Sequence, residues 1–464
     1  MDFRIKRTAT AIAVATALAM PGVALAQTDA EKALEARVAE LEKLVQQLSA
    51  DQTKTATEVA TTAKAVEEAK TPPAPPPAPT VSTANKGSLT VKGFVIASLY
   101  AQDANFAFGN GQSAEFPTGE YSTDKWTYGG DVRNTRLTLD WKGPEVANGA
   151  KFGGLVEMDF FGGFAGGGFT DEQPNPRLRL AYVDVTKGDT TIRIGQAWSP
   201  FFGNVPASPA HVAFPLGFGS AGMVGWRFPG LFVYHNFSKN AKLTLAAMRG
   251  SWNDASPSFG NGAGESGTPQ FEARLDFSAG PWSLYVVGHY DQKDCNLVGD
   301  TSASVCGYGY TKKNLDGTAV ELGAKATFGK FTLAGNVYQG TAIGNQFGQI
   351  TQFGDISGWG GWLQGSVKFT PQWSANLFYG MEKPDDGDLF AFIAPPAAGS
   401  APARARGENE MIAASVMYSS GPYVFGIEWL NDKVTMAGKN SSGLPVSDIS
   451  YRGNQLSFSA WYKF

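Results

Sequence analysis

Arginines are the residues of this sequence whose spacing best predicts chemistry. Apolar and polar residues alternate in several segments, so that one face of an extended strand is apolar and the other carries the charges. A guanidinium group stays charged at any relevant pH and binds carboxylates through two parallel hydrogen bonds. A narrow passage beside such groups would favour small anions by electrostatic bias rather than through a tight site. We expect one inner surface to carry Arg136, Arg177, Arg179, Arg193, Arg227 and Arg274.

Carboxylates at similar positions favour weak selectivity instead of anion preference. If acids face the arginines across one passage, the field runs across it and gives little net preference between anions and cations. A weakly selective passage is therefore the alternative. The acids that the same alternation places inward are Asp140, Asp159, Glu157, Glu272, Glu321 and Glu428.

A long aromatic segment follows the strand that contains Arg193. Residues 199–221 hold four prolines together with Phe201, Phe202, His211, Phe214 and Phe218. This composition is too apolar for a loop in free water. We expect an infolded constriction loop that faces the arginines; the alternative is a loop packed on a neighbouring subunit.

The elements that must position these residues are strands. From Gly87 onward the apolar pattern has period two, and short turns such as Lys187-Gly188-Asp189 alternate with long polar segments, the last over 434–449. Counting one short and one long connection per hairpin gives about sixteen strands, if 223–237 is one strand through Pro229. An even number of strands with such asymmetric ends indicates an outer-membrane barrel, and sixteen are enough for a water-filled lumen. The predicted fold is all-β: a sixteen-stranded antiparallel transmembrane β-barrel over 87–464, preceded by a short α-helical coiled coil.

Composition agrees with this fold. Only 17% of the 464 residues are charged, and 56 are glycine, well above the ~7% glycine of an average protein. Past residue 26 no apolar run approaches the roughly 18 residues that a spanning helix needs, which excludes a helical membrane protein. The net charge of −4 predicts no bulk attraction to nucleic acid.

The first 86 residues divide into three parts. Residues 1–26 have the basic start, apolar centre and Ala24-Leu25-Ala26 end of a secretory signal peptide. Residues 27–70 carry a heptad seam and predict a periplasmic coiled coil; a lone amphipathic helix is the alternative. Residues 71–86 are a linker whose prolines favour a semi-rigid polyproline spacer rather than a ligand for a proline-binding module. The seam begins with Leu34, Val38, Leu41, Val45 and Leu48.

Export also explains the two cysteines. Cys295 and Cys306 are the only ones in the sequence, and an oxidising compartment favours a disulfide between them. One cysteine pair without a nearby histidine supplies too few ligands for a metal. We therefore expect no metal and no cofactor.

The C-terminal strand carries its own signal. Leu456, Phe458, Ala460, Tyr462 and Phe464 share one face, and the chain ends on an aromatic residue. This resembles the C-terminal strand of bacterial outer-membrane proteins, whose terminal Phe is read by the barrel assembly machinery. The resemblance makes Phe464 the expected contact with that machinery, and the outward faces the expected contact with outer-membrane lipid and lipopolysaccharide.

The whole arrangement resembles the DcaP-type trimeric outer-membrane porins of Gram-negative bacteria. The likeness spans essentially the mature chain, and local likeness lies in Val91–Phe94, Arg133–Leu137, Arg179–Val183 and Arg193–Phe201, none of which is diagnostic by itself. It implies a homotrimer of sixteen-stranded barrels in the outer membrane with the coiled coil in the periplasm. It also implies passive uptake of small anionic solutes such as dicarboxylates. Arg136 and Arg193 lie within these likenesses and are the best candidates for pore residues.

Two other classes of function compete with a channel. A hydrolase needs a serine, histidine and acid constellation, and of the three histidines only His235 and His289 fall in strands, without a marked serine partner. We therefore expect no enzyme. A weakly selective porin that also tethers the envelope through its coiled coil is the stronger rival.

Overall fold

The computed structural model describes residues 80–82, 87–107, 116–118, 126–162, 174–249, 268–295, 306, 310–347 and 354–464, with scattered positions between 36 and 54. The chain divides into two units, Met1–Thr71 and Pro72–Phe464. In the first unit the described residues are helical and exposed. The signal peptide and the seam residues of the predicted coiled coil lie outside the described residues.

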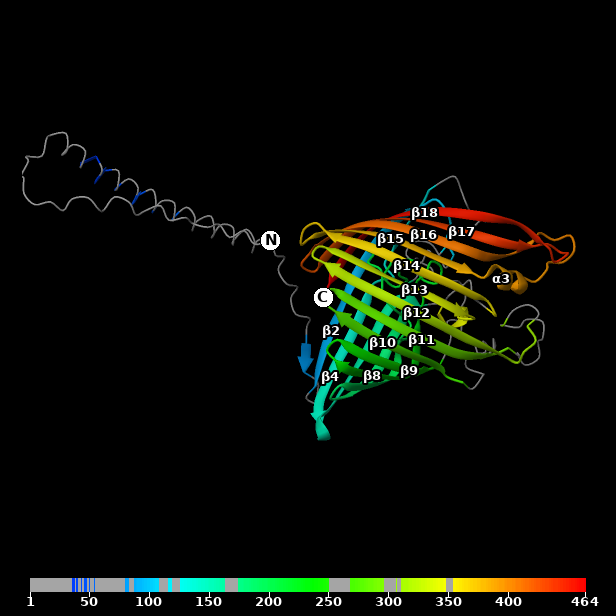
Figure 1. Ribbon diagram of the computed structural model, residues 1–464, viewed down its shortest axis with the longest axis horizontal. Coiled ribbons are helices and arrows are strands. Elements are labelled where there is room, and N and C mark those ends of the chain that lie inside the picture. The colour runs from blue at the N-terminus through cyan, green and yellow to red at the C-terminus, as the bar shows by residue number, and fades with distance from the viewer. Residues whose placement is uncertain are drawn as a thin grey trace, which may run out of the picture. The chain divides into compact units, whose positions relative to one another are not determined.

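The second unit is one closed sheet in which every strand pair is antiparallel (Figure 1). Its first half contains β1 (Thr80–Ser82), β2 (Ser88–Gln102), β3 (Thr127–Asp131), β4 (Arg136–Val146), β5 (Ala150–Gly162), β6 (Asn175–Lys187), β7 (Thr190–Trp198), β8 (Arg227–Ser238) and β9 (Ala241–Met248). Its second half contains β10 (Gln270–Ala279), β11 (Trp282–Asp294), β12 (Asn314–Phe328), β13 (Phe331–Thr341), β14 (Ser357–Lys368), β15 (Trp373–Pro384), β16 (Ala403–Ser420), β17 (Tyr423–Lys439) and β18 (Pro445–Lys463).

These segments make the sixteen strands that the sequence predicts. Both β3 and β4 pair with β2, along different parts of it, so together they occupy one position in the wall. The short β1 pairs with the start of β2. The remaining strands follow in chain order, and β18 pairs with β2 to close the barrel. Pro229 lies inside β8 opposite Gln196, as the strand count requires.

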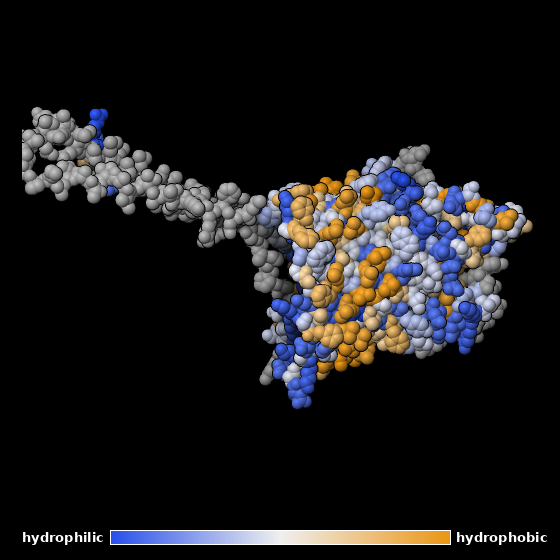
Figure 2. Space-filling view, viewed as in Figure 1, coloured by the Kyte–Doolittle hydropathy of each residue, from blue (hydrophilic) through white to orange (hydrophobic). Residues whose placement is uncertain are grey.

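Alternation gives the barrel an apolar outside. Leu99, Ile194, Leu377 and Phe458 are exposed, whereas Ser98, Asn376 and Ser459 on the other face are buried. Figure 2 shows hydrophobic residues gathered over the strands of the visible face, with hydrophilic residues toward the ends. No helix in the described part of the chain is long and apolar enough to cross a membrane.

Short turns join the strands at one end of the barrel. Five of them have two residues, and Gly188 and Gly280 take positive φ angles of 57° and 56° there. Glycine adopts this left-handed conformation without a steric penalty, which is why it stands at these positions. The other end carries the longer connections, which include α2 (Gly344–Phe347) and α3 (Asp386–Phe392).

Three segments differ from the sequence prediction. The strand expected over 223–237 begins only at Arg227, and residues 223–226 belong to the connection before it. The expected long loop over 434–449 shrinks to 440–444, because β17 and β18 continue past Lys439 and from Pro445. Its Ser, Asp and Gly residues suit a loop, but here they pair across a hairpin. The segment Thr80–Ser82 falls in the predicted linker but forms β1, where Thr80 pairs with Thr90.

Candidate functional site: an arginine cluster beside an infolded loop

Residues 199–226, which we call the inner loop, fill part of the barrel interior. The loop begins after β7, and its backbone is held by side chains of strands on the far wall. Phe201 N donates to Glu272 Oε2 at 2.8 Å, and Ala207 N to Gln364 Oε1 at 2.7 Å. Trp461 Nε1 donates to Pro209 O at 2.8 Å. Because these partners come from β10, β14 and β18, the loop crosses the interior.

The predicted aromatic residues of this loop lie inside the barrel. Phe201 and Phe214 are buried, and Phe202 stacks on Trp198 with 3.8 Å between ring centroids. His211 Nδ1 lies 2.7 Å from Glu428 Oε1, which also accepts from Ser208 Oγ at 2.8 Å. These contacts place the segment within the barrel interior.

Five arginines, which we call the arginine cluster, face one side of the inner loop. They come from neighbouring parts of the wall, and two irregularities aim them inward. The sheet breaks between β3 and β4, and a register shift opposite Glu157 and Met158 leaves Arg179 as an extra residue in β6. Such a bulge re-aims the side chains around it. The members are Arg133, Arg136, Arg177, Arg179 and Arg227.

Three carboxylates neutralise part of this cluster. Arg177 forms a two-point pair with Asp159, at 2.9 and 2.7 Å. Arg179 bridges Glu157 at 2.8 Å and Asp159 at 2.6 Å. Arg133 pairs with Asp131, two residues earlier in the chain. Each of these three guanidiniums has at least one charged hydrogen-bond partner. Hydrogen bonds between charged groups are stronger than those between neutral groups.

Arg136 and Arg227 are different because they lack such a partner. Arg136 Nε lies 3.8 Å from Glu157 Oε1, beyond hydrogen-bonding distance. Arg227 is only 4% exposed and lies over the rings of Trp226 and Trp198, at 4.1 and 4.9 Å. Among the described residues, Arg136 Nε and Nη2 and Arg227 Nε and Nη1 have no hydrogen-bond partner, and neither has Nη1 of Arg133 or of Arg177, whose other nitrogens are bonded. Buried N–H donors are normally satisfied, so these atoms are candidate contacts for an anion.

Arg193 and Arg274 lie apart from the cluster and are compensated. Arg193 forms two 2.8 Å bonds to Asp184 and lies 3.4 Å over the ring of Tyr182. Arg274 bonds Asp276 at 2.8 Å and donates to Pro200 O, at the start of the inner loop, at 3.0 Å. Four of the six predicted arginines therefore lie together, and the other two stand apart, each paired with an aspartate.

Cys295 and Cys306 form a disulfide in the connection between β11 and β12. Cys295 N donates to Lys313 O at 2.7 Å, and Tyr310 OH donates to Asn314 O at 2.8 Å. Burial raises the pKa of the Tyr310 hydroxyl, which keeps it a donor. The described residues hold no group of three or more His, Cys, Asp or Glu arranged for a metal ion.

Sequence reasoning missed several residues of the site. Arg133 was noted only as part of a family likeness, although it joins the cluster. Asn134 anchors the inner loop through Ala210 O and Ala213 N. Phe347 of α2 reaches the inner loop from another connection. A polar four-residue helix leaves no periodic signal, so only the folded chain brings Phe347 to this place.

A closed sixteen-stranded barrel with short turns at one end and a loop folded inside has the architecture of outer-membrane porins. No family model matches the sequence, and no curated protein is similar to it. Solved structures share the fold. The outer membrane channel DcaP of Acinetobacter baumannii is 19% identical, with a TM-score of 0.61 over 83% of this chain and 99% of that one. An anion-selective porin from Comamonas acidovorans is 14% identical, with a TM-score of 0.52 over 82% and 100%. The trimer form of Vibrio cholerae OmpT is 12% identical, with a TM-score of 0.50 over 82% and 99%.

Proposed function

We propose that this protein is an outer-membrane porin, a passive channel that prefers small anionic solutes such as dicarboxylates. The barrel fold supports the channel, and two proteins of similar structure, an outer membrane channel and an anion-selective porin, agree with it. A homotrimer is part of the proposal, supported by the trimer form of a third similar structure. The outward apolar faces would contact outer-membrane lipid and lipopolysaccharide, and the N-terminal helix would stand in the periplasm.

The observation that carries the anion preference is the charge balance of the arginine cluster. Five guanidiniums face three carboxylates, Asp131, Glu157 and Asp159, beside the inner loop. The excess positive charge lies with Arg227 and with Arg136, which shares Glu157 with Arg179 at a distance of 3.8 Å, and the free N–H groups of both suit a carboxylate. A passing anion 4 Å from one such charge gains between about 1 kcal/mol in water and about 4 kcal/mol at an effective dielectric near 20. Tenfold selectivity needs only about 1.4 kcal/mol.

The test is single-channel recording across a salt gradient. The wild-type reversal potential should indicate anion preference, and replacing both Arg136 and Arg227 by glutamine should move it toward zero. Arg193→Gln combined with Asp184→Asn is the matched control, because it removes both members of a neutral pair, leaves the net charge unchanged and should shift the potential less. Cation preference in the wild type would refute the proposal.

A weakly selective porin with a tethering role is the second candidate. The acids opposite Arg177 and Arg179 favour weak selectivity, because they cancel most of the local charge. For the tether, deleting residues 27–80 is the discriminating experiment. If conductance persists while the barrel separates from the cell-wall fraction, the N-terminal segment has a second role.

Assembly through the C-terminus belongs to the same proposal. Phe464 N donates to Gly93 O at 3.1 Å, and Gly93 N to Phe464 O at 2.9 Å, so the last residue is paired to the first long strand. We propose that Phe464 is also the residue that the barrel assembly machinery recognises. Deleting it should reduce the amount of folded barrel in outer-membrane fractions, and an unchanged amount would argue against recognition.

A further inference from the structure

A second segment enters the barrel beside the inner loop. Helix α2 follows β13, and its Phe347 is fully buried. The Phe347 ring stacks on Phe201 of the inner loop, with centroids 4.8 Å apart and an angle of 9° between the planes. It also meets His289 edge-on at 4.6 Å and lies 6.3 Å from Phe228. Phe347 therefore fills the space between the inner loop and the wall.

A row of buried charged side chains holds both infolded segments. Glu272 accepts from the backbone N–H of Phe201 and, through its other oxygen, lies 3.0 Å from His289 Nδ1. His289 Nε2 lies 3.1 Å from Asp291 Oδ1, and Lys293 Nζ lies 3.3 Å from Asp291 Oδ2. The four side chains, on β10 and β11, are each at most 5% exposed. Lys293 ends the row at the other infolded segment.

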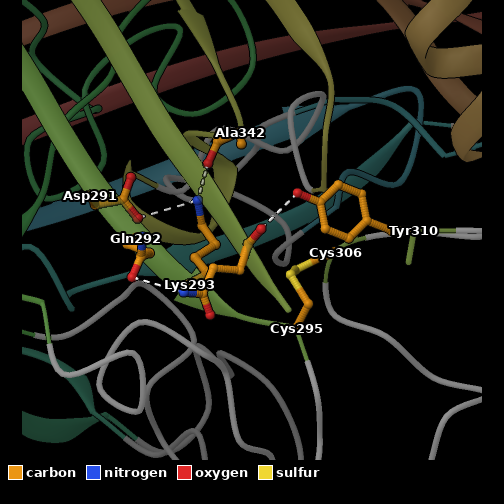
Figure 3. The surroundings of a disulfide bond; sticks show 8 residues. Asp291, Gln292, Lys293, Cys295, Cys306, Tyr310 and Ala342 are labelled. Carbon is orange, nitrogen blue, oxygen red and sulfur yellow. Dashed lines mark hydrogen bonds and ion pairs between the residues drawn. A yellow bond between two sulfur atoms is a disulfide. The ribbon is translucent and has the colours of Figure 1, made fainter. Parts of the chain in front are cut away.

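The entry to α2 is fixed at that end of the row. Lys293 Nζ donates to the carbonyl of Ala342, a buried residue with a φ of 60° that non-glycine residues rarely adopt (Figure 3). Such a backbone persists only where its surroundings enforce it. Ala342 packs with Cys295, Cys306 and Leu315, so the disulfide lies against the same point. The inner loop and α2 are thus tied to opposite ends of one polar row.

We propose that Phe347 is a size-determining wedge, a residue that packs between Phe201 of the inner loop and the wall at His289 and Phe228, fixes the position of the loop in the interior and thereby sets the largest solute that passes. The proposal rests on the proposed channel function and concerns solute size rather than charge. Phe347 meets β8 at Phe228, but the row of side chains that anchors it lies on β10 and β11, whereas most of the arginine cluster lies on β4 and β6 and in the break before β4. An uncharged polymer is the suitable probe of the wedge, because the charge of the arginines does not affect its entry.

The experiment compares wild-type channels with Phe347→Ala, using single-channel conductance in the presence of polyethylene glycols of graded size. With the ring removed, larger polymers should enter and lower the conductance, while the reversal potential in a salt gradient stays at the wild-type value. Phe271→Ala is the control, since that ring points outward on β10 and is 47% exposed. Phe347→Leu keeps apolar volume without the stacked ring and should give an intermediate cut-off.

The outcomes separate this inference from the channel proposal. An unchanged polymer cut-off in folded Phe347→Ala channels that still prefer anions would overturn the wedge alone. A wild-type protein that conducts no ions would overturn the proposed channel function. If Phe347→Ala does not fold, Phe347→Leu decides, and a wild-type cut-off in that variant counts against the wedge.

Discussion

Asn134 clamps the inner loop at Ala210: its Nδ2 donates to Ala210 O at 3.0 Å, while its Oδ1 accepts from Ala213 N at 2.7 Å. Asn134 lies in the break between β3 and β4 and is fully buried. The same break places Arg133 within the arginine cluster. One interruption in the sheet therefore positions both the loop and part of the charge that faces it.

Replacing Asn134 by alanine should release this part of the inner loop. The change leaves a buried carbonyl and a buried N–H without partners, which costs about 1–3 kcal/mol each in the free energy of unfolding. Urea unfolding of the detergent-solubilised protein measures this loss. Channel recordings should show added current noise, because a freed loop moves within the passage.

Asn376→Ala is the matched control for this experiment. Asn376 is also a buried inward asparagine, but its Nδ2 bonds Ser415 Oγ on the neighbouring strand at 3.0 Å. Its loss should lower stability without adding current noise. Equal noise in both variants would contradict the role of Asn134 as the loop clamp.

Asp159→Asn should destabilise the barrel strongly. Asp159 is fully buried and neutralises both Arg177 and Arg179, so its loss leaves buried charge uncompensated, at a cost of about 3–5 kcal/mol. Asp140→Asn breaks a more exposed pair with Lys92 and should cost about 1 kcal/mol or less. Equilibrium unfolding of the two variants compares the costs, and similar values would show that burial does not govern these pairs.

The strand alternation was predictable, but the pairing of charges was not. Period two alone predicts that Arg177 and Arg179 share a face, and both reach Asp159. Beyond the bulge at Arg179 the inward positions change from odd to even, so Tyr182 and Asp184 face Arg193. The sequence shows no sign of this extra residue, because it depends on the register between β5 and β6.

Reducing the disulfide should loosen the connection between β11 and β12. Cys295 and Cys306 are 11 residues apart in sequence, and closing a loop of this size contributes about 2–3 kcal/mol in the chain-entropy model. Cys295→Ser combined with Cys306→Ser should therefore increase protease cleavage of this connection. Cleavage at the wild-type rate would indicate that other contacts suffice to hold it.

Turn glycines should differ from strand glycines in their tolerance of alanine. Gly188 has a φ of 57° and open space around it, so Gly188→Ala places an L-residue in the left-handed region at a cost of about 1–2 kcal/mol. Gly365 also has open space but lies inside β14 without a positive φ. Gly365→Ala should be neutral or stabilising by roughly 0.5–1 kcal/mol. Urea midpoints measure both effects, and equal losses would contradict the conformational explanation.

The inner loop and α2 mark the limit of what composition predicts. Five aromatic or imidazole side chains made residues 199–221 recognisable as an interior segment, although Glu272, Gln364 and Glu428 could not be named as its anchors. Those contacts join the inner loop to residues on strands that are more than 70 positions away in sequence. Phe347 had no such signal, since its helix is a single turn.

The pairing of β2 with β18 has a consequence for the folding of the newly synthesised chain. Ser98 and Ser459 lie 361 residues apart, and yet their hydroxyl oxygens are 2.6 Å from each other across the seam. Until β18 has formed, the edge of β2 that faces it is unpaired, and an unpaired strand edge tends to pair with strands of other chains. Contacts at such separation also form slowly. Because β2 and β18 pair last, we expect the newly made chain to need protection of its open β2 edge from other strands until Phe464 is in place.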